Sequence, residues 1–177
     1  MNAAATALRR DRLSVVLVLA LASLAFRGVA TWSFVVPVLA AVGVLAAQAR
    51  AGEAAERWTW MLVTGSGIAA CAVVRAALPG VPMHATMLGV AASVAAAVAE
   101  EIVFRRGLYG ALERWGPIVA VVASAIVFGL VHAPMYGWAV VGVDVGAGLV
   151  FGWQRWASGT WTSPAATHVA ANLLGAF

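Results

Sequence analysis

The sequence predicts an all-α fold, a polytopic bundle of about seven transmembrane helices that forms one membrane-embedded domain over residues 1–177. The chain is 63% hydrophobic and only 10% charged, and its mean hydropathy is +0.94. A soluble domain of this length cannot bury so much apolar surface in one core. Its apolar residues also gather in runs of roughly 17 to 25, the length that crosses a bilayer as a helix. These observations exclude a soluble globular protein.

Short breaks rich in arginine, glutamate, glycine or proline separate the predicted spans. Arg27 and the four residues after it separate the first two spans so briefly that both could form one re-entrant hairpin. The charged stretch 50–57 ends the second span, the Leu-Pro-Gly at 78–80 ends the third, and Gly116-Pro117, Pro134 and Ser158-Gly159 end the next three. The resulting spans cover 13–29, 32–48, 58–78, 85–113, 117–133, 137–156 and 161–177.

The distribution of arginine predicts the orientation. All eleven basic residues are arginines, and cytoplasmic loops carry the excess of such residues. With the N-terminus inside, only Arg27 and Arg75 lie toward outer ends of spans. The inner ends hold Arg9, Arg10, Arg12, Arg50, Arg57, Arg114 and Arg155. We therefore expect a multi-pass protein of a prokaryotic-type plasma membrane with a cytoplasmic N-terminus.

The net charge of +4 follows from this distribution of arginine, which sets the topology and attracts the chain to the lipid bilayer. No basic cluster with interleaved aromatic residues indicates nucleic-acid binding. The opening of the chain also resembles a secretory signal peptide, but the apolar pattern resumes directly after Arg27, which favours an uncleaved first span.

Three predicted spans carry polar side chains that a bilayer normally excludes. Burying a charged group at membrane depth costs a few kcal/mol at least, so such residues usually face a polar cavity and mark a site. Asp144 is a further acid within a span and fits none of the pairs that the others form. The polar residues are Glu100, Glu101 and Arg105 in the fourth span, His132 in the fifth, and His168 and Asn172 in the seventh.

The fourth span predicts different roles for its adjacent acids. Residues four apart on a helix are neighbours, so Glu101 and Arg105 share a face in the favourable order, whereas Glu100 points roughly 100° away. Arg105 can neutralise Glu101, which leaves Glu100 without a cation on its own helix and available as a general base. Alternatively, the pair only fixes the helix register and the cytoplasm solvates Glu100.

The two histidine spans add the remaining candidates. His132 ends the fifth span, and a lone histidine there is as readily explained by an interfacial or structural role. His168 and Asn172 lie four apart on one face and present two donors that could stabilise a developing oxyanion. Alternatively, they only form hydrogen bonds between helices.

These residues form three ordered motifs: EExxxR through Glu100, Glu101 and Arg105, FxxxH through Phe128 and His132, and HxxxN through His168 and Asn172. In this order, each on its own apolar helix, they resemble the CPBP family of intramembrane proteases, which includes the CAAX prenyl endopeptidases. The resemblance covers residues 85–177 as a catalytic core. Arg106 departs from it, standing where a glycine commonly follows the motif arginine.

The resemblance implies that Glu100 and His132 activate a water and that His168 and Asn172 stabilise the oxyanion. Glu101, Arg105 and Phe128 would support the site, with no cofactor and with a membrane-associated protein or peptide as substrate. The leading hypothesis is thus a glutamic-type intramembrane endopeptidase.

Two alternatives remain open at this point. One is a zinc peptidase with Glu100, His132 and His168 as ligands, although it would need a separate base. The other is a non-catalytic membrane carrier or immunity scaffold. One inconsistency also appears, because the predicted spans put His132 near an outer end but Glu100 and His168 near mid-membrane.

Overall fold

The computed structural model describes residues 3–27, 35–48, 56–77 and 86–176, and all regular structure in these residues is helical. The predicted breaks at 50–55 and 78–80 lie outside the described residues. The main helices are α1 (Ala3–Phe26), α2 (Val35–Gln48), α3 (Arg57–Ala77), α4 (Met87–Glu101), α5 (Tyr109–Leu112), α6 (Pro117–Tyr136), α7 (Val141–Ser158) and α8 (Thr162–Ala176).

Three described helical runs are long and apolar enough to cross a membrane: Arg57–Ala77, Met87–Trp115 and Pro117–Tyr136. This confirms an all-α protein with membrane-spanning helices, but not the count of seven spans. The other helices fall short for visible reasons. α2 and α8 have only 14 and 15 residues, α1 begins with a cluster of charges, and α7 carries Asp144 and Arg155.

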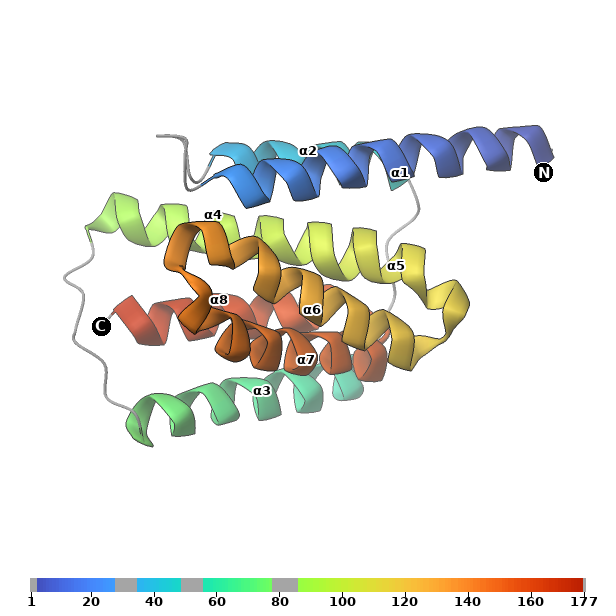
Figure 1. The fold of residues 1–177 in the computed structure, drawn as a ribbon. Helices are drawn as coiled ribbons and strands as arrows, with labels where there is room; N and C mark the ends of the chain where they lie inside the picture. Colours follow the sequence, from blue (N-terminus) through green and yellow to red (C-terminus); the bar gives the residue numbers. More distant parts are fainter. Residues whose placement is uncertain (1–2, 28–34, 49–55, 78–85, 177) are drawn as a thin grey trace.

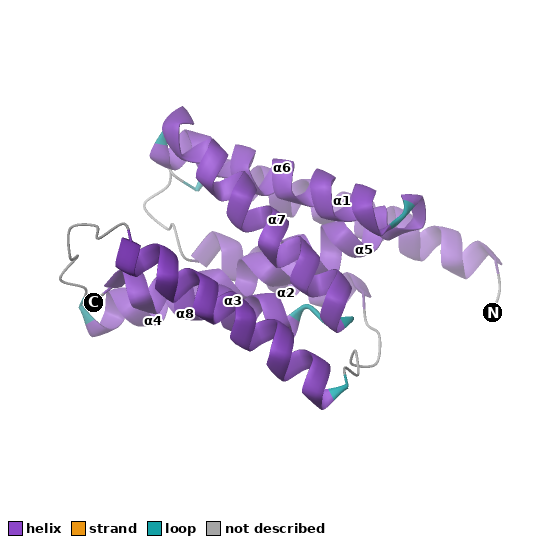
Figure 2. Cartoon of the chain, turned by 90° about the horizontal axis from the view of Figure 1, so that it is seen from below, coloured by secondary structure: helices purple, strands orange, loops and turns teal. Residues whose placement is uncertain are grey.

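The helices pack as one bundle in which α1 and α2 lie side by side over the run that begins with α4 (Figure 1). α6 and α7 form the most extensive helix pair, and α8 packs between α3, α4 and α7 (Figures 1 and 2). The apolar core lies under α1 and α2, where Leu24, Val44, Val103, Phe104 and Phe128 are almost completely buried.

The fourth predicted span is continuous but not a uniform α-helix. After α4, residues Ile102–Leu108 form a π-helical segment, followed by α5 and a 3₁₀ turn at Glu113–Trp115. π-helical turns are rare and frequently occur at functional sites. Here the π segment begins directly after Glu101 and contains Arg105.

A tight turn at Gly116 reverses the chain between this run and α6. Its φ of 105° lies in a region that favours glycine, and Pro117 follows as the first residue of α6. Glu100 and His132 each lie sixteen residues from Gly116, one on each side. The hairpin therefore brings both residues to the same level of the bundle.

The predicted end of the fifth span at Pro134 is wrong, because α6 continues through Pro134 to Tyr136. Pro134 has no N–H to donate to the carbonyl one turn earlier, but only two helical residues follow it, so it interrupts a single hydrogen bond near the end of α6. Gly137 closes the helix with a backbone hydrogen bond of 2.8 Å to the Ala133 oxygen. His132 thus lies one turn inside α6, and its Nε2 is 3.7 Å from Oε2 of Glu100, so the two residues share one level of the bundle.

α6 and α7 approach closely because Gly129 has no side chain. A carbon added there would lie 3.0 Å from the carbonyl oxygen of Val141, tighter than ordinary contact. The first half of α7 is thereby held against the end of α6. This approach carries Asp144 to the level of His132.

Candidate active site

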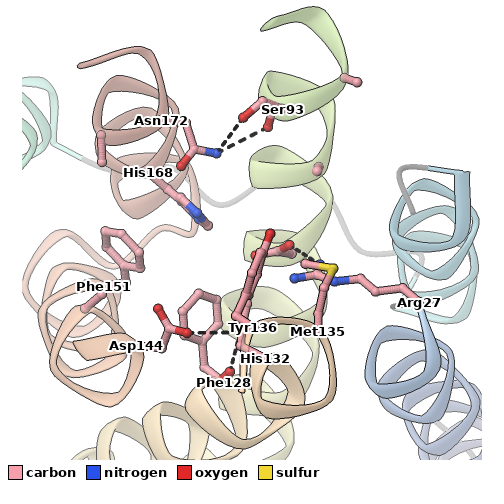
Figure 3. A pocket seen from close by; sticks show the side chains of 15 residues that line it. Arg27, Ser93, Phe128, His132, Met135, Tyr136, Asp144, Phe151, His168 and Asn172 are labelled. Carbon is pink, nitrogen blue, oxygen red and sulfur yellow. Dashed lines mark hydrogen bonds and ion pairs between the residues drawn. The ribbon is translucent and has the colours of Figure 1, made fainter. Parts of the chain in front are cut away.

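All four predicted catalytic residues line one cavity of about 450 Å³ between α1, α4, α6, α7 and α8 (Figure 3). α4 supplies Glu100, α6 supplies His132, and α8 supplies His168 and Asn172. Other lining residues come from all five helices and include Arg27, Ser93, Phe128, Tyr136, Asp144 and Phe151. The structure therefore brings together residues that the sequence places on three separate spans.

Glu100 binds two different partners with its two carboxylate oxygens. Oε1 accepts a hydrogen bond from the Arg27 guanidinium at the end of α1, and Oε2 lies 3.7 Å from Nε2 of His132. Arg27 and Glu100 are only 4% and 5% exposed. The second distance is too long for a direct hydrogen bond and leaves room for a shared water.

Glu101 repeats this arrangement with a second arginine and a second histidine. Its Oε2 lies 3.3 Å from Nε of Arg105, and its Oε1 lies 3.0 Å from Nδ1 of His168. Glu101 and Arg105 are completely buried, and Arg105 also donates a 3.2 Å hydrogen bond to the Gly148 carbonyl. Each adjacent glutamate thus connects one arginine with one histidine.

His132 is oriented from both sides of its ring. Nδ1 lies 2.6 Å from the Phe128 carbonyl oxygen, and because that oxygen only accepts, Nδ1 carries the proton. Nε2 then faces Glu100 with its lone pair. Asp144 of α7 lies on the other side, with Oδ2 3.9 Å from Nδ1 (Figure 3).

Phe128 packs at the centre of the site. Its ring centroid lies 4.7 Å from that of His132 and 5.9 Å from that of His168. The Arg105 guanidinium lies 4.9 Å from the same centroid, within the range of a cation–π contact. The aromatic ring therefore fixes the separation of the two histidines and packs against the buried cation.

Asn172 lies one helical turn beyond His168 and points toward α4. Its Nδ2 donates to Oγ of Ser93 at 3.1 Å and is 3.4 Å from the Ser93 carbonyl oxygen (Figure 3). This contact ties α8 to α4 across the cavity. An interhelical hydrogen bond, the alternative expected from sequence, is therefore present.

Sequence reasoning missed Arg27 and Asp144 as parts of this site. Arg27 was interpreted as a charge at an outer end, although it binds Glu100 from 73 residues away. The sequence signal for Asp144 is that an acid within an apolar span, without a partner in its own span, usually faces a polar cavity. Arg106, the departure from the motif, lies outside the cavity and donates from Nε to Gln48 Oε1 at 3.0 Å.

The cavity residues do not form an evident metal site. Within the described parts of the chain, no three His, Cys, Asp or Glu side chains are grouped so that they could hold a metal ion. Of the three ligands considered for zinc, Glu100 has one oxygen bound to Arg27.

The model of the type II CAAX prenyl endopeptidase Rce1-like family matches residues 82–174 of the chain. The match covers just over half of the chain and includes every residue of the three motifs. The chain belongs to this family. It is therefore a member of a peptidase family and an integral membrane protein. No curated protein and no solved structure matched the chain.

Proposed function

We propose that the protein is a glutamic-type intramembrane endopeptidase, which hydrolyses a peptide bond of a membrane-associated protein or peptide. The observation that carries this proposal is the cavity in which Glu100 Oε2 and His132 Nε2 lie 3.7 Å apart and opposite the donors of α8. A carboxylate and an imidazole at this separation can hold one water between them and polarise it.

In the first step, the water would lose a proton to the Glu100–His132 pair as its oxygen attacks the carbonyl carbon of the substrate. His132 suits this step, because its Nδ1 proton is held by the Phe128 carbonyl while Nε2 remains free to accept. Asp144 beside Nδ1 would stabilise the imidazolium that forms. The carbonyl bond opens to a tetrahedral oxyanion.

In the second step, His168 and Asn172 would donate to that oxyanion. A doubly protonated His168 donates from Nδ1 to Glu101 and keeps Nε2–H for the cavity. Asn172 uses one of its two N–H groups on Ser93 and retains the other. The oxyanion then collapses, the peptide bond breaks, and the proton taken from water passes to the leaving amine.

Glu101 and Arg105 would have a supporting role. Both are completely buried, and Glu101 holds the His168 ring that the oxyanion requires. The mechanism needs no metal or cofactor. We further propose that the chain crosses a prokaryotic-type plasma membrane seven times, with its N-terminus in the cytoplasm. The three helical runs that are long and apolar enough to cross a membrane would be the third, fourth and fifth of these spans.

The decisive experiment is terminal labelling of the membrane proteome in cells that express the wild type or Glu100→Gln. New termini should appear with the wild type and disappear with Glu100→Gln, which retains the shape of the side chain but removes the base. Glu113→Gln is the matched control, because Glu113 is an exposed acid of the same helical run, outside the cavity. Cleavage that survives in Glu100→Gln would refute the mechanism.

A chelator arm with purified protein separates the hydrolytic alternatives. Cleavage should persist in chelator, with no stoichiometric zinc in the wild type. Zinc that is lost in His168→Ala would establish the metal mechanism instead. Proteoliposomes that move protons without any cleavage would favour the non-catalytic carrier.

A further inference from the structure

The cavity lies toward one end of the bundle. Its lining residues come from the ends of α1, α6 and α8 and from the start of α7, with the deepest acid in the later part of α4. Because helices that follow one another in the chain run in opposite directions, these positions share the end that holds Tyr136 and the start of α4 (Figure 1). The N-terminus lies at the opposite end, as Figure 1 shows.

Exposure rises toward that same end. Glu100, Phe128 and His132 are buried at the deep side of the cavity. Ser93 and Met135 are half-buried, and Tyr136, which ends α6, is 59% exposed. The cavity therefore opens toward the end of the bundle opposite the N-terminus.

Arginine gathers at the end without the cavity. Hydrogen bonds between Trp60 and Thr162 and between Gln48 and Arg106 tie this end together across the bundle. Cytoplasmic ends carry the excess of basic residues, and acidic residues contribute little to orientation. The described arginines toward this end are Arg9, Arg10, Arg12, Arg57, Arg106, Arg114 and Arg155.

Both described arginines at the cavity end have local partners. Arg27 is buried and binds Glu100 inside the cavity. Arg75 donates a 3.1 Å hydrogen bond from Nε to the Leu174 carbonyl oxygen at the end of α8. These two described arginines are outnumbered by the larger group at the other end, and that excess indicates the orientation.

From these observations we infer that the cavity opens on the outer face of the membrane, and that the substrate is a membrane-anchored polypeptide whose scissile bond lies on that side. The substrate part rests on the proposed peptidase function. The substrate segment that carries this bond would enter the cavity at its outer end, pass Tyr136 and reach Glu100 and His132. Cytoplasmic segments would face the arginine-rich end, toward which the cavity does not open.

Site-directed cysteine labelling tests the orientation without any need for cleavage. Cys71 is the chain's one cysteine, so a Cys71→Ser background removes the native thiol. Met87→Cys and Tyr136→Cys report on the cavity end, and Trp58→Cys and Trp115→Cys report on the opposite end. All four positions are more than half exposed. Two positions at each end keep the test decisive if one variant fails to insert.

Intact cells are treated with a membrane-impermeant maleimide, and permeabilised cells give the total labelling. We expect Met87→Cys and Tyr136→Cys to label in intact cells, and Trp58→Cys and Trp115→Cys to label only after permeabilisation, with at least a tenfold contrast. The reverse pattern, or the same reactivity at both ends, would overturn the inference.

The substrate part is tested on the termini that depend on wild-type Glu100. Their cleavage sites should lie on the outer side of each substrate's membrane anchor. If the labelling places the cavity outside but every dependent site is cytoplasmic, the substrate inference fails while the peptidase function stands. If the labelling succeeds and no dependent termini exist, the peptidase function and the substrate inference fail while the orientation of the cavity stands.

Discussion

The two halves of the chain contribute unequally to the cavity. Among the described residues, the half matched by the family, residues 82–174, supplies every residue that lines the cavity except one, including Glu100, His132 and His168. The described part of the N-terminal half supplies Arg27, at the end of α1. The groups proposed to react thus belong to the family half, whereas the ion pair of Glu100 depends on a residue outside it. The following substitutions test how far this division holds.

The largest effect should come from Glu101→Gln in the family half. This change leaves the Arg105 guanidinium without its carboxylate in a site that is completely buried. Breaking a buried pair costs about 3 to 5 kcal/mol in the free energy of unfolding. A denaturant titration in detergent measures the loss, with Glu113→Gln as the exposed control. An unchanged unfolding midpoint would mean that Glu101 does not hold the family half together.

Asn172→Ala should lower turnover by about 10² to 10³, the usual cost of removing one oxyanion donor. KM should change little, because the charge that Asn172 stabilises forms only in the transition state. Steady-state kinetics on a substrate found by terminal labelling give both values. Leu174→Ala, on the exposed side of the same helix, is the control. A rise in KM with unchanged turnover would assign Asn172 to substrate binding.

Gly129→Ala should destabilise the protein by about 1 to 3 kcal/mol, because the added methyl group pushes α7 away from α6. Turnover should fall as well, since Asp144 would move away from His132. Gly142→Ala is a matched control in α7, with nothing within 4 Å of the added carbon. Equal stability of the two variants would show that close approach at Gly129 is not required.

The smallest effect on turnover should come from Arg27→Gln, about tenfold, and because Arg27 and Glu100 form a buried pair this variant should also be less stable. Arg27 holds Oε1 of Glu100 and so directs Oε2 toward His132, and misplacement of a reacting group costs this much or more. Arg27→Lys should recover part of the loss, and Arg75→Gln should have no effect. Turnover normalised to the folded fraction of each variant separates this role from a loss of folding. If Arg27→Gln had the same kinetics as the wild type, the reaction would depend only on residues of the family half.

The local contacts of the site could be predicted from helical spacing, and the long-range ones could not. Four-residue spacing predicted the Glu101–Arg105 contact and the shared face of His168 and Asn172. The Arg27–Glu100 contact joins helices far apart in sequence, and nothing in the spacing of either helix indicates it. Asp144 depends in the same way on how closely α7 packs at Gly129.

The helix boundaries show a similar limit. The sequence predicts that a proline ends the fifth span, but Pro134 interrupts a single backbone hydrogen bond and α6 closes only at Gly137. The π segment at Ile102–Leu108 also has no recognisable pattern, since nothing in its sequence IVFRRGL distinguishes it from an α-helix. Such features depend on packing, which single-sequence periodicity does not report.

The hairpin at Gly116 has a consequence for bilayer thickness. Glu100 and His132 lie on arms of equal length, so a thicker or thinner bilayer that shifts or tilts the hairpin moves both residues together. Their separation should then be the same in membranes of different composition. What would change is the depth at which a substrate bond must lie to meet them, so lipid composition would select among substrates by the length of their anchors.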